Sequence, residues 1–178
     1  MDKQIFVING SGGVGKDTFI TMVQKVLEDI DYGYCVYNYS SVTRVKSIME
    51  DCGWDGVSKT EKDRKFMSDL KLLLTEYNDL PFKDLEFVAN EFANSPYEND
   101  AMLFFHIREP EEIARAAKVF NAKTILIKRD SIKHITSNMA DENVYNYDYD
   151  IIIDNNGTLE DLKNKAEQFV IDCGYEIN

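Results

Sequence analysis

The chain has 178 residues, of which 44% are hydrophobic and 12% aromatic, and it carries a formal net charge of −12. This length suits one folded domain with a core of its own, and the hydrophobic fraction excludes a disordered chain. The acidic balance argues against broad electrostatic binding to nucleic acid or to anionic membranes. We therefore expect a single domain over residues 1–178 that has neither kind of partner.

The sequence contains no sign of a membrane or secreted protein. No apolar run approaches the roughly 20 residues that cross a bilayer, and residues 5–8 are too few for the core of a signal peptide. The cysteines Cys35, Cys52 and Cys173 are far apart, odd in number and outside any Cys-x-x-Cys pattern, which argues against a disulfide framework or a zinc site. We expect a soluble cytoplasmic protein.

The first half of the chain predicts two strands and several helices. Residues 5–8 form a short apolar run, and after a glycine-rich stretch the apolar residues of 18–30 recur at helical spacing. Residues 36–39 predict a second strand, and the serines at 40 and 41 can cap a helix that runs through residue 49. The middle of the chain predicts two polar-rich helices, over residues 59–77 and 81–94.

The second half returns to alternating strands and helices. Pro110, followed by two glutamates, is typical of a helix start, and Thr158 with Asp161 fits a capping box whose fourth position is an aspartate. The predicted strands cover residues 101–107, 124–127 and 150–153, and the predicted helices cover 110–120 and 158–170. Strands that alternate with helices predict an α/β fold, in which a parallel sheet of about five strands is covered on both faces.

The residues between the first strand and the first helix carry the strongest functional signal. Gly10, Gly15 and Lys16 have the spacing of a phosphate-binding loop, in which glycines let backbone N–H groups point inward and the lysine meets the β and γ phosphates. The following helix adds its N-terminal dipole to the same anion site. The predicted nucleotide-binding residues are Gly10, Ser11, Gly12, Gly13, Val14, Gly15, Lys16, Asp17 and Thr18.

The position after the lysine departs from the usual pattern. A Ser or Thr normally stands there and ligates Mg²⁺, whereas this chain has Asp17 followed by Thr18. Asp17 can take the metal through its carboxylate, or it can cap the helix while Thr18 reaches the metal. We favour contact between Asp17 and the metal and keep both residues as candidate ligands.

Three segments resemble one family. Residues 15–18, Gly-Lys-Asp-Thr, resemble the loop ending of phage-type deoxynucleoside monophosphate kinases and related P-loop nucleoside and nucleotide kinases. Residues 147–162 are similar to the closing strand and helix of those kinases, and residues 107–112 resemble their segment with an acceptor-contacting arginine. The resemblance implies a three-layer P-loop NTPase fold, ATP with Mg²⁺, and a nucleoside monophosphate as acceptor. It also implies a helical acceptor-binding insertion, at about residues 40–99.

Four arginines are candidates for binding phosphate groups. Arg108 follows a strand at the carboxyl edge of the sheet, where ligands bind, and is expected to hold the acceptor's phosphate. Arg44 and Arg64, on helices of the middle region, are further candidates for substrate binding, although helix charges are usually solvated. Arg129 begins a polar segment, residues 129–147, that is either a lid over the triphosphate or a solvated loop. We expect His106 to be a core histidine.

Other functions fit the sequence less well. A GTPase would need the motif Asn-Lys-x-Asp, which residues 127–130 match except for the missing asparagine. The Asp-x-x-Gly motif of residues 154–157 also comes after this partial match instead of before it. A kinase for an unphosphorylated metabolite would need a carboxylate base. A module that senses nucleotides without turnover is the non-enzyme alternative. The favoured hypothesis is an ATP-dependent kinase whose catalytic cations are Lys16, Arg108 and Arg129.

Overall fold

The structure is a computed structural model that describes residues 3–31, 33–58, 60–131 and 143–177. Contacts within the chain divide it into two compact units. The first unit comprises Met1–Asn38 and Ser95–Asn178, and the second comprises Tyr39–Asn94. The second unit covers nearly the same residues as the predicted helical insertion, about 40–99.

The first unit is built on a five-stranded sheet in the order β2-β3-β1-β4-β5. Its strands are β1 (Gln4–Asn9), β2 (Cys35–Ser40), β3 (Asp100–His106), β4 (Lys123–Lys128) and β5 (Ile151–Asp154). β1 pairs in parallel with β3 and β4, so that Ile8 lies opposite His106 and Asn9 opposite Leu126. The carboxyl ends of these strands therefore meet at one edge of the sheet.

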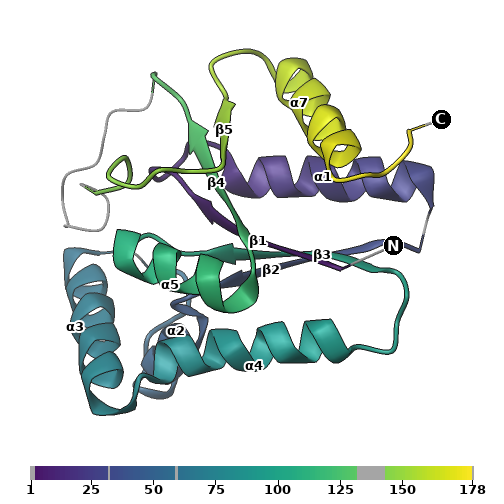
Figure 1. Ribbon diagram of the computed structural model, residues 1–178. Helices are drawn as coiled ribbons and strands as arrows, with labels where there is room; N and C mark the ends of the chain where they lie inside the picture. Colours follow the sequence, from purple (N-terminus) through teal and green to yellow (C-terminus); the bar gives the residue numbers. More distant parts are fainter. Residues whose placement is uncertain (1–2, 32, 59, 132–142, 178) are drawn as a thin grey trace. The chain divides into compact units, whose positions relative to one another are not determined.

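Helices cover both faces of this sheet. They are α1 (Lys16–Ile30), α5 (Pro110–Phe120) and α7 (Leu159–Asp172). Helices α1 and α7 pack against each other on one face, and α5 contacts β1 and β4 on the other, as Figure 1 shows. This arrangement confirms the predicted α/β architecture with five parallel strands between two helical layers.

The core between the sheet and the α1–α7 layer is rich in phenylalanine. The rings of Phe6 on β1 and Phe104 on β3 stack at 5.1 Å, and Phe169 of α7 meets Phe6 edge-on at 5.1 Å. Full burial of each such side chain contributes roughly 1.5–3 kcal/mol. The contacts hold α7 against two central strands and so fix the edge at which these strands end.

Local sequence signals explain where several elements begin. Thr158 caps α7: its Oγ1 accepts from the backbone N–H of Asp161 at 3.2 Å, while Asp161 Oδ2 accepts from the N–H of Thr158 at 2.7 Å. This is the predicted capping box. α5 begins at Pro110, as its proline and the following glutamates predict.

The second unit consists of helices that contact one another. They are α2 (Thr43–Asp51), α3 (Glu61–Asn78) and α4 (Leu80–Asn94). Val45, Met49, Phe82 and Leu85 are fully or almost fully buried here. α3 begins with a second capping box, formed by Thr60 and Asp63, and so starts two residues later than predicted.

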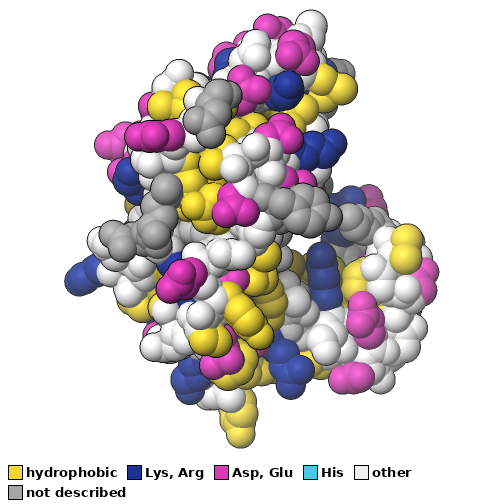
Figure 2. Space-filling view, turned by 90° about the vertical axis from the view of Figure 1, so that its right-hand side faces the viewer, with side chains coloured by type: hydrophobic (Ala, Val, Ile, Leu, Met, Phe, Trp, Pro, Cys, Tyr) yellow, Lys and Arg dark blue, Asp and Glu magenta, His cyan; other side chains and the backbone are white. Residues whose placement is uncertain are grey.

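The charged side chains of the surface and the hydropathy of the helices can be examined directly in the structure. On the face drawn in Figure 2, Lys and Arg side chains are interspersed with Asp and Glu and do not gather in one basic patch. None of the helices within the described ranges has both the length and the apolarity that a membrane span requires.

Candidate functional site

The loop between β1 and α1 has the shape that its glycines allow. Gly10 and Gly15 have φ angles of 145° and 101°, which residues with a Cβ rarely adopt. A Cβ on Gly10 would lie 2.5 Å from the carbonyl oxygen of Ile127, and one on Gly15 would lie 2.5 Å from Asn155 Nδ2. Both positions therefore exclude a side chain on grounds of backbone conformation and of space.

Asn155 supports the loop from the end of β5. Its Nδ2 donates to the carbonyl oxygen of Val14 at 2.8 Å, and its backbone N–H donates to the carbonyl oxygen of Lys128 at 2.7 Å. The Asn155 side chain is buried, and its hydrogen bond to Val14 is therefore shielded from water and holds the loop in place. The sequence analysis did not single out Asn155, although it directly follows a predicted strand.

Lys16 is the first residue of α1, and its side chain turns back over the loop. Its Nζ donates to the carbonyl oxygens of Gly10 at 2.5 Å and Ser11 at 3.0 Å. The Ser11 side chain is only 1% exposed, and within the described part of the chain its Oγ has no hydrogen-bond partner. A cation over a glycine loop beside an unsatisfied hydroxyl is a donor set that suits phosphate oxygens.

Asn9 connects the start of the loop with two other segments. Its Oδ1 accepts from the backbone N–H of Gly10 at 2.8 Å, and its Nδ2 donates to Tyr149 Oη at 2.7 Å and to the carbonyl oxygen of Arg108 at 3.2 Å. Both hydrogens of the amide are thereby used. The backbone of Arg108, two residues after the end of β3, is thus fixed beside the phosphate loop.

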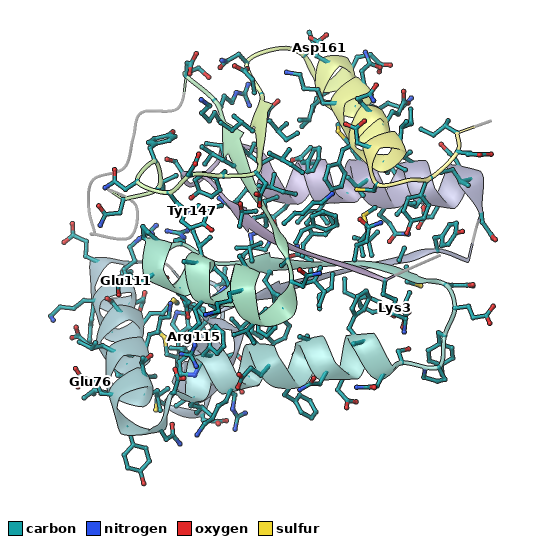
Figure 3. All side chains as sticks on the ribbon, in the orientation of Figure 1. Lys3, Glu76, Glu111, Arg115, Tyr147 and Asp161 are labelled. Carbon is teal, nitrogen blue, oxygen red and sulfur yellow. The ribbon has the colours of Figure 1, made fainter. Side chains whose placement is uncertain are left out.

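Tyr149 completes this connection. Its hydroxyl donates to the carbonyl oxygen of Val144 at 2.8 Å, and its ring meets that of Tyr147, labelled in Figure 3, at 5.0 Å. Burial raises the pKa of Tyr149 to about 12, although the hydrogen bond from Asn9 acts in the opposite direction. The hydroxyl therefore stays protonated near neutral pH and remains a donor.

Asp17 lies in the first turn of α1, and its side chain points to neighbouring strands. The cap of α1 is Gly15, and no side chain caps this helix end. Asp17 Oδ1 lies 3.4 Å from Asn38 Nδ2, near the end of β2, and 3.7 Å from His106 Nε2, at the end of β3. The carboxylate is 85% exposed; Asn38 donates a hydrogen bond to it, whereas His106 Nε2 lies at ion-pair distance, beyond that of a hydrogen bond.

The side-chain oxygens of Asp17 and Thr18 are suited to a magnesium ion that binds together with phosphate groups. Mg²⁺ takes oxygen ligands and is usually bound through one or two carboxylates together with phosphate oxygens and waters. Asp17 supplies a carboxylate, and the exposed Thr18 supplies a hydroxyl one residue later. Residues 3–31, 33–58, 60–131 and 143–177 contain no group of three or more His, Cys, Asp or Glu side chains suited to a metal. Phosphate oxygens and waters are the further ligands that Mg²⁺ usually takes at such sites.

Two of the candidate arginines belong to this unit. Arg108 follows β3 after one intervening residue, Arg129 directly follows β4, and both are exposed. Next to Arg129, the backbone N–H of Asp130 donates to Asn156 Oδ1 at 2.7 Å, and Asn156 Nδ2 donates to Asp130 Oδ2 at 2.8 Å. Residues 132–142 of the predicted lid lie outside the described residues, so the lid remains a prediction.

The other two candidate arginines belong to the second unit. Arg44 lies on α2 and Arg64 on α3, and both are exposed. Tyr39 Oη donates to Asp84 Oδ2 at 2.6 Å, and burial, reinforced by Asp84, raises the pKa of Tyr39, whereas the charge of Arg44 lowers it. The roles of both arginines in substrate binding remain predictions.

His106 has a position that the sequence analysis did not anticipate. The apolar run around it predicts a core histidine, and the side chain is indeed largely buried, at 17% exposure; it is also the last residue of β3 and lies beside Asp17. Its place at the strand end was the available signal, because side chains at carboxyl ends of parallel strands face the ligand edge.

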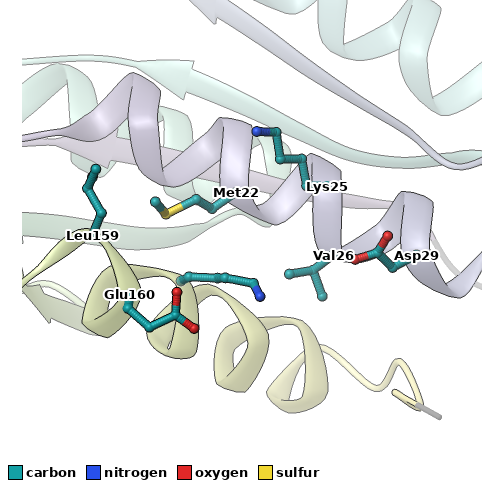
Figure 4. A pocket seen from close by; sticks show the side chains of 7 residues that line it. Met22, Lys25, Val26, Asp29, Leu159 and Glu160 are labelled. Atoms are coloured by element: carbon teal, nitrogen blue, oxygen red, sulfur yellow. The ribbon is translucent and has the colours of Figure 1, made fainter.

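A separate small pocket lies between α1 and α7, away from the loop (Figure 4). Its lining combines apolar side chains with two lysines and two acids: Met22, Lys25, Val26, Asp29, Leu159, Glu160 and Lys163. These charges come from exposed helix faces and balance one another, so we assign the pocket no part in phosphate binding.

The parallel sheet, the glycine loop after β1 and the helix that follows it define a P-loop α/β fold. No protein-family model matches the sequence, and no curated protein matches it. A provisionally assigned kinase from Chloroflexus aurantiacus matches in structure with 13% identity and a TM-score of 0.47, covering 98% of this chain and 100% of the other. Shikimate kinase from Aquifex aeolicus matches with 14% identity and a TM-score of 0.46, covering 94% and 96%. Likenesses at this level of identity and TM-score say nothing about the activity of this chain.

Proposed function

We propose that this protein is an ATP-dependent phosphotransferase whose acceptor is a nucleoside monophosphate. The observation that carries the proposal is the phosphate loop, where Lys16 Nζ lies over the carbonyl oxygens of Gly10 and Ser11. The loop lies at the carboxyl edge of the sheet, which is the ligand-binding edge of such folds. The position of Arg108, held beside the same loop by Asn9, supports the choice of acceptor.

Phosphoryl transfer asks the protein mainly for positioning and charge stabilisation. In the proposed reaction, Lys16 and the backbone N–H groups of the loop hold the β and γ phosphates of ATP. Asp17 and Thr18 are the candidate ligands of Mg²⁺, which when bound would neutralise charge on these phosphates. Arg108 holds the acceptor's phosphate, and Arg129 is a further cation for the transferred group.

A monophosphate acceptor suits Arg108 because a guanidinium can form two parallel hydrogen bonds to a phosphate. The carbonyl oxygen of Arg108 accepts from Asn9 at 3.2 Å, so the backbone that carries this guanidinium is anchored. An anchored backbone reduces the entropy that is lost when the side chain binds its ligand.

A kinase for an unphosphorylated metabolite is the second candidate. One observation favours it, namely the exposed carboxylate of Asp17 beside the loop, which could accept a proton from an acceptor hydroxyl. A nucleotide-sensing module would use the loop alone. The three possibilities differ in what binds beside ATP and in whether ADP is released.

The test is isothermal titration of an ATP analogue and of a panel of nucleoside monophosphates. The variants are Arg108→Ala and Arg108→Lys, with Arg115→Ala on α5 as a matched control, because Arg115 is also an exposed arginine. We expect both Arg108 variants to lose at least about tenfold in monophosphate affinity, since charge-assisted hydrogen bonds contribute roughly 1.5–3 kcal/mol. Affinity for the ATP analogue should stay within about twofold.

Each alternative has its own result. Unchanged monophosphate affinity in the Arg108 variants would refute the acceptor role of this residue. A wild-type protein that binds no monophosphate but releases ADP with a small alcohol would be a metabolite kinase. A protein that binds nucleotide but forms no ADP with any acceptor tested would be a nucleotide-sensing module.

A further inference from the structure

The carboxylate of Asp17 is contacted by side chains from two neighbouring strands. Asn38 comes near the end of β2, and His106 is the last residue of β3. These strands are adjacent in the sheet, so the two residues approach the first turn of α1 from the same edge. Asp17 is 85% exposed, and yet side chains from two segments far away in sequence lie within 3.7 Å of its carboxylate.

Both contacts involve the same oxygen. Asn38 Nδ2 lies 3.4 Å and His106 Nε2 lies 3.7 Å from Oδ1 of Asp17. Within the described ranges, Oδ2 has no hydrogen bond or ion pair. Asn38 donates a hydrogen bond to Oδ1, and the imidazole of His106 lies within ion-pair distance of the same oxygen, beyond hydrogen-bond distance. The two side chains come from different strands and leave the second oxygen accessible.

The carboxylate does not serve its own helix. The cap position of α1 is Gly15, which has no side chain, and the helix start has no side-chain cap. The one side-chain hydrogen bond from α1 to this residue runs from Thr21 Oγ1 to the carbonyl oxygen of Asp17, not to its carboxylate. The carboxylate lies next to Lys16 and is contacted from other strands. It is therefore available to a ligand that binds at the phosphate loop.

We propose that His106 and Asn38 are positioning residues that hold Oδ1 of Asp17 and so direct Oδ2 to a divalent cation bound with the triphosphate. The proposal rests on the proposed nucleotide site and adds residues that the sequence did not reveal. It follows a general property of metal sites, in which the carboxylate ligand is itself held by hydrogen-bond donors. Loss of such outer partners typically lowers metal affinity by about 10- to 100-fold.

The measurable quantity is the coupling between metal and nucleotide. We would titrate the full chain with a non-hydrolysable ATP analogue, once in EDTA and once in Mg²⁺, and take the ratio of the two affinities. Binding of Mn²⁺ with ADP, followed by electron paramagnetic resonance, gives an independent readout of the ion. Neither measurement depends on turnover.

The variants separate a loss of carboxylate positioning from a general loss of structure or of nucleotide binding. His106→Leu and Asn38→Ala remove the donors, whereas His106→Gln keeps an N–H group near the place of Nε2. Asn164→Ala, which removes an exposed amide on α7, is the matched control. We expect the first two to lower the Mg²⁺ coupling about tenfold and to leave metal-free affinity within about twofold, while His106→Gln retains most of the coupling.

A double-mutant cycle with Asp17→Asn tests whether the two residues act through Asp17. In that background, His106→Leu should have no further effect on coupling. Asn38 is exposed, so Asn38→Ala and His106→Gln still decide the question if His106→Leu does not fold.

Two results would overturn the positioning role and leave the nucleotide site intact. One is a coupling between Mg²⁺ and nucleotide that is unchanged in both Asn38→Ala and the His106 variants. The other is an effect of His106→Leu on this coupling that is still present in the Asp17→Asn background. A wild-type protein that binds the analogue in neither EDTA nor Mg²⁺ would instead refute the nucleotide site, and the positioning role with it.

Discussion

The hydroxyl of Tyr149 offers a sharp test of how the phosphate loop is held. It forms two buried hydrogen bonds, donating to the carbonyl oxygen of Val144 at 2.8 Å and accepting from Asn9 Nδ2 at 2.7 Å. Tyr149→Phe keeps the ring and removes both bonds. The carbonyl oxygen of Val144 and one hydrogen of Asn9 then lose their partners inside the protein.

The expected cost follows from the energetics of buried hydrogen bonds. Each bond contributes about 0.5–1.5 kcal/mol net, and an unsatisfied buried group costs about 1–3 kcal/mol. We therefore expect Tyr149→Phe to lower the free energy of unfolding by about 2–3 kcal/mol. For a chain of this size, that loss corresponds to a fall in Tm of roughly 4–12 °C.

Urea denaturation followed by circular dichroism measures this loss, provided that the m value is the same in both proteins. Tyr97→Phe is the matched control, because Tyr97 is 69% exposed and its hydroxyl has no hydrogen bond in the described part of the chain. The control should change stability by less than about 0.5 kcal/mol. If Tyr149→Phe lowers the free energy of unfolding no more than the control does, the hydrogen bonds of Tyr149 to Asn9 and Val144 do not stabilise the loop.

Two further predictions concern catalysis by the proposed kinase. Lys16→Ala should lower turnover by about 10²- to 10³-fold and leave the circular dichroism spectrum unchanged, because the glycines shape the loop; turnover within a few-fold of wild type would remove Lys16 from the mechanism. Asp17→Asn should raise the Mg²⁺ concentration for half-maximal activity at least about tenfold more than Thr18→Val does, and equally small shifts in both variants would mean that neither residue ligates the ion.

Features that depend on neighbouring residues could be predicted from the amino-acid sequence. The loop is recognisable because Gly10, Gly15 and Lys16 lie within seven residues, and local backbone geometry decides where its N–H groups point. The starts of α5 and α7 were predicted for the same reason, from Pro110 and from Thr158 with Asp161. The alternation of strands and helices was enough to predict a parallel sheet with two covered faces.

The distant residues that meet at the loop could not be predicted in this way and are seen in the three-dimensional structure. Asn155 supports Val14, and Tyr149 meets Asn9, across separations of 141 and 140 residues. His106 and Asn38 come to Asp17 because β2, β3 and β1 are neighbours in the sheet, an order that differs from the order of the strands in the chain. Local patterns carry no information about that order. Strand order is set by packing of the whole core, and parallel pairing then brings the carboxyl ends of the chosen neighbours to the same edge.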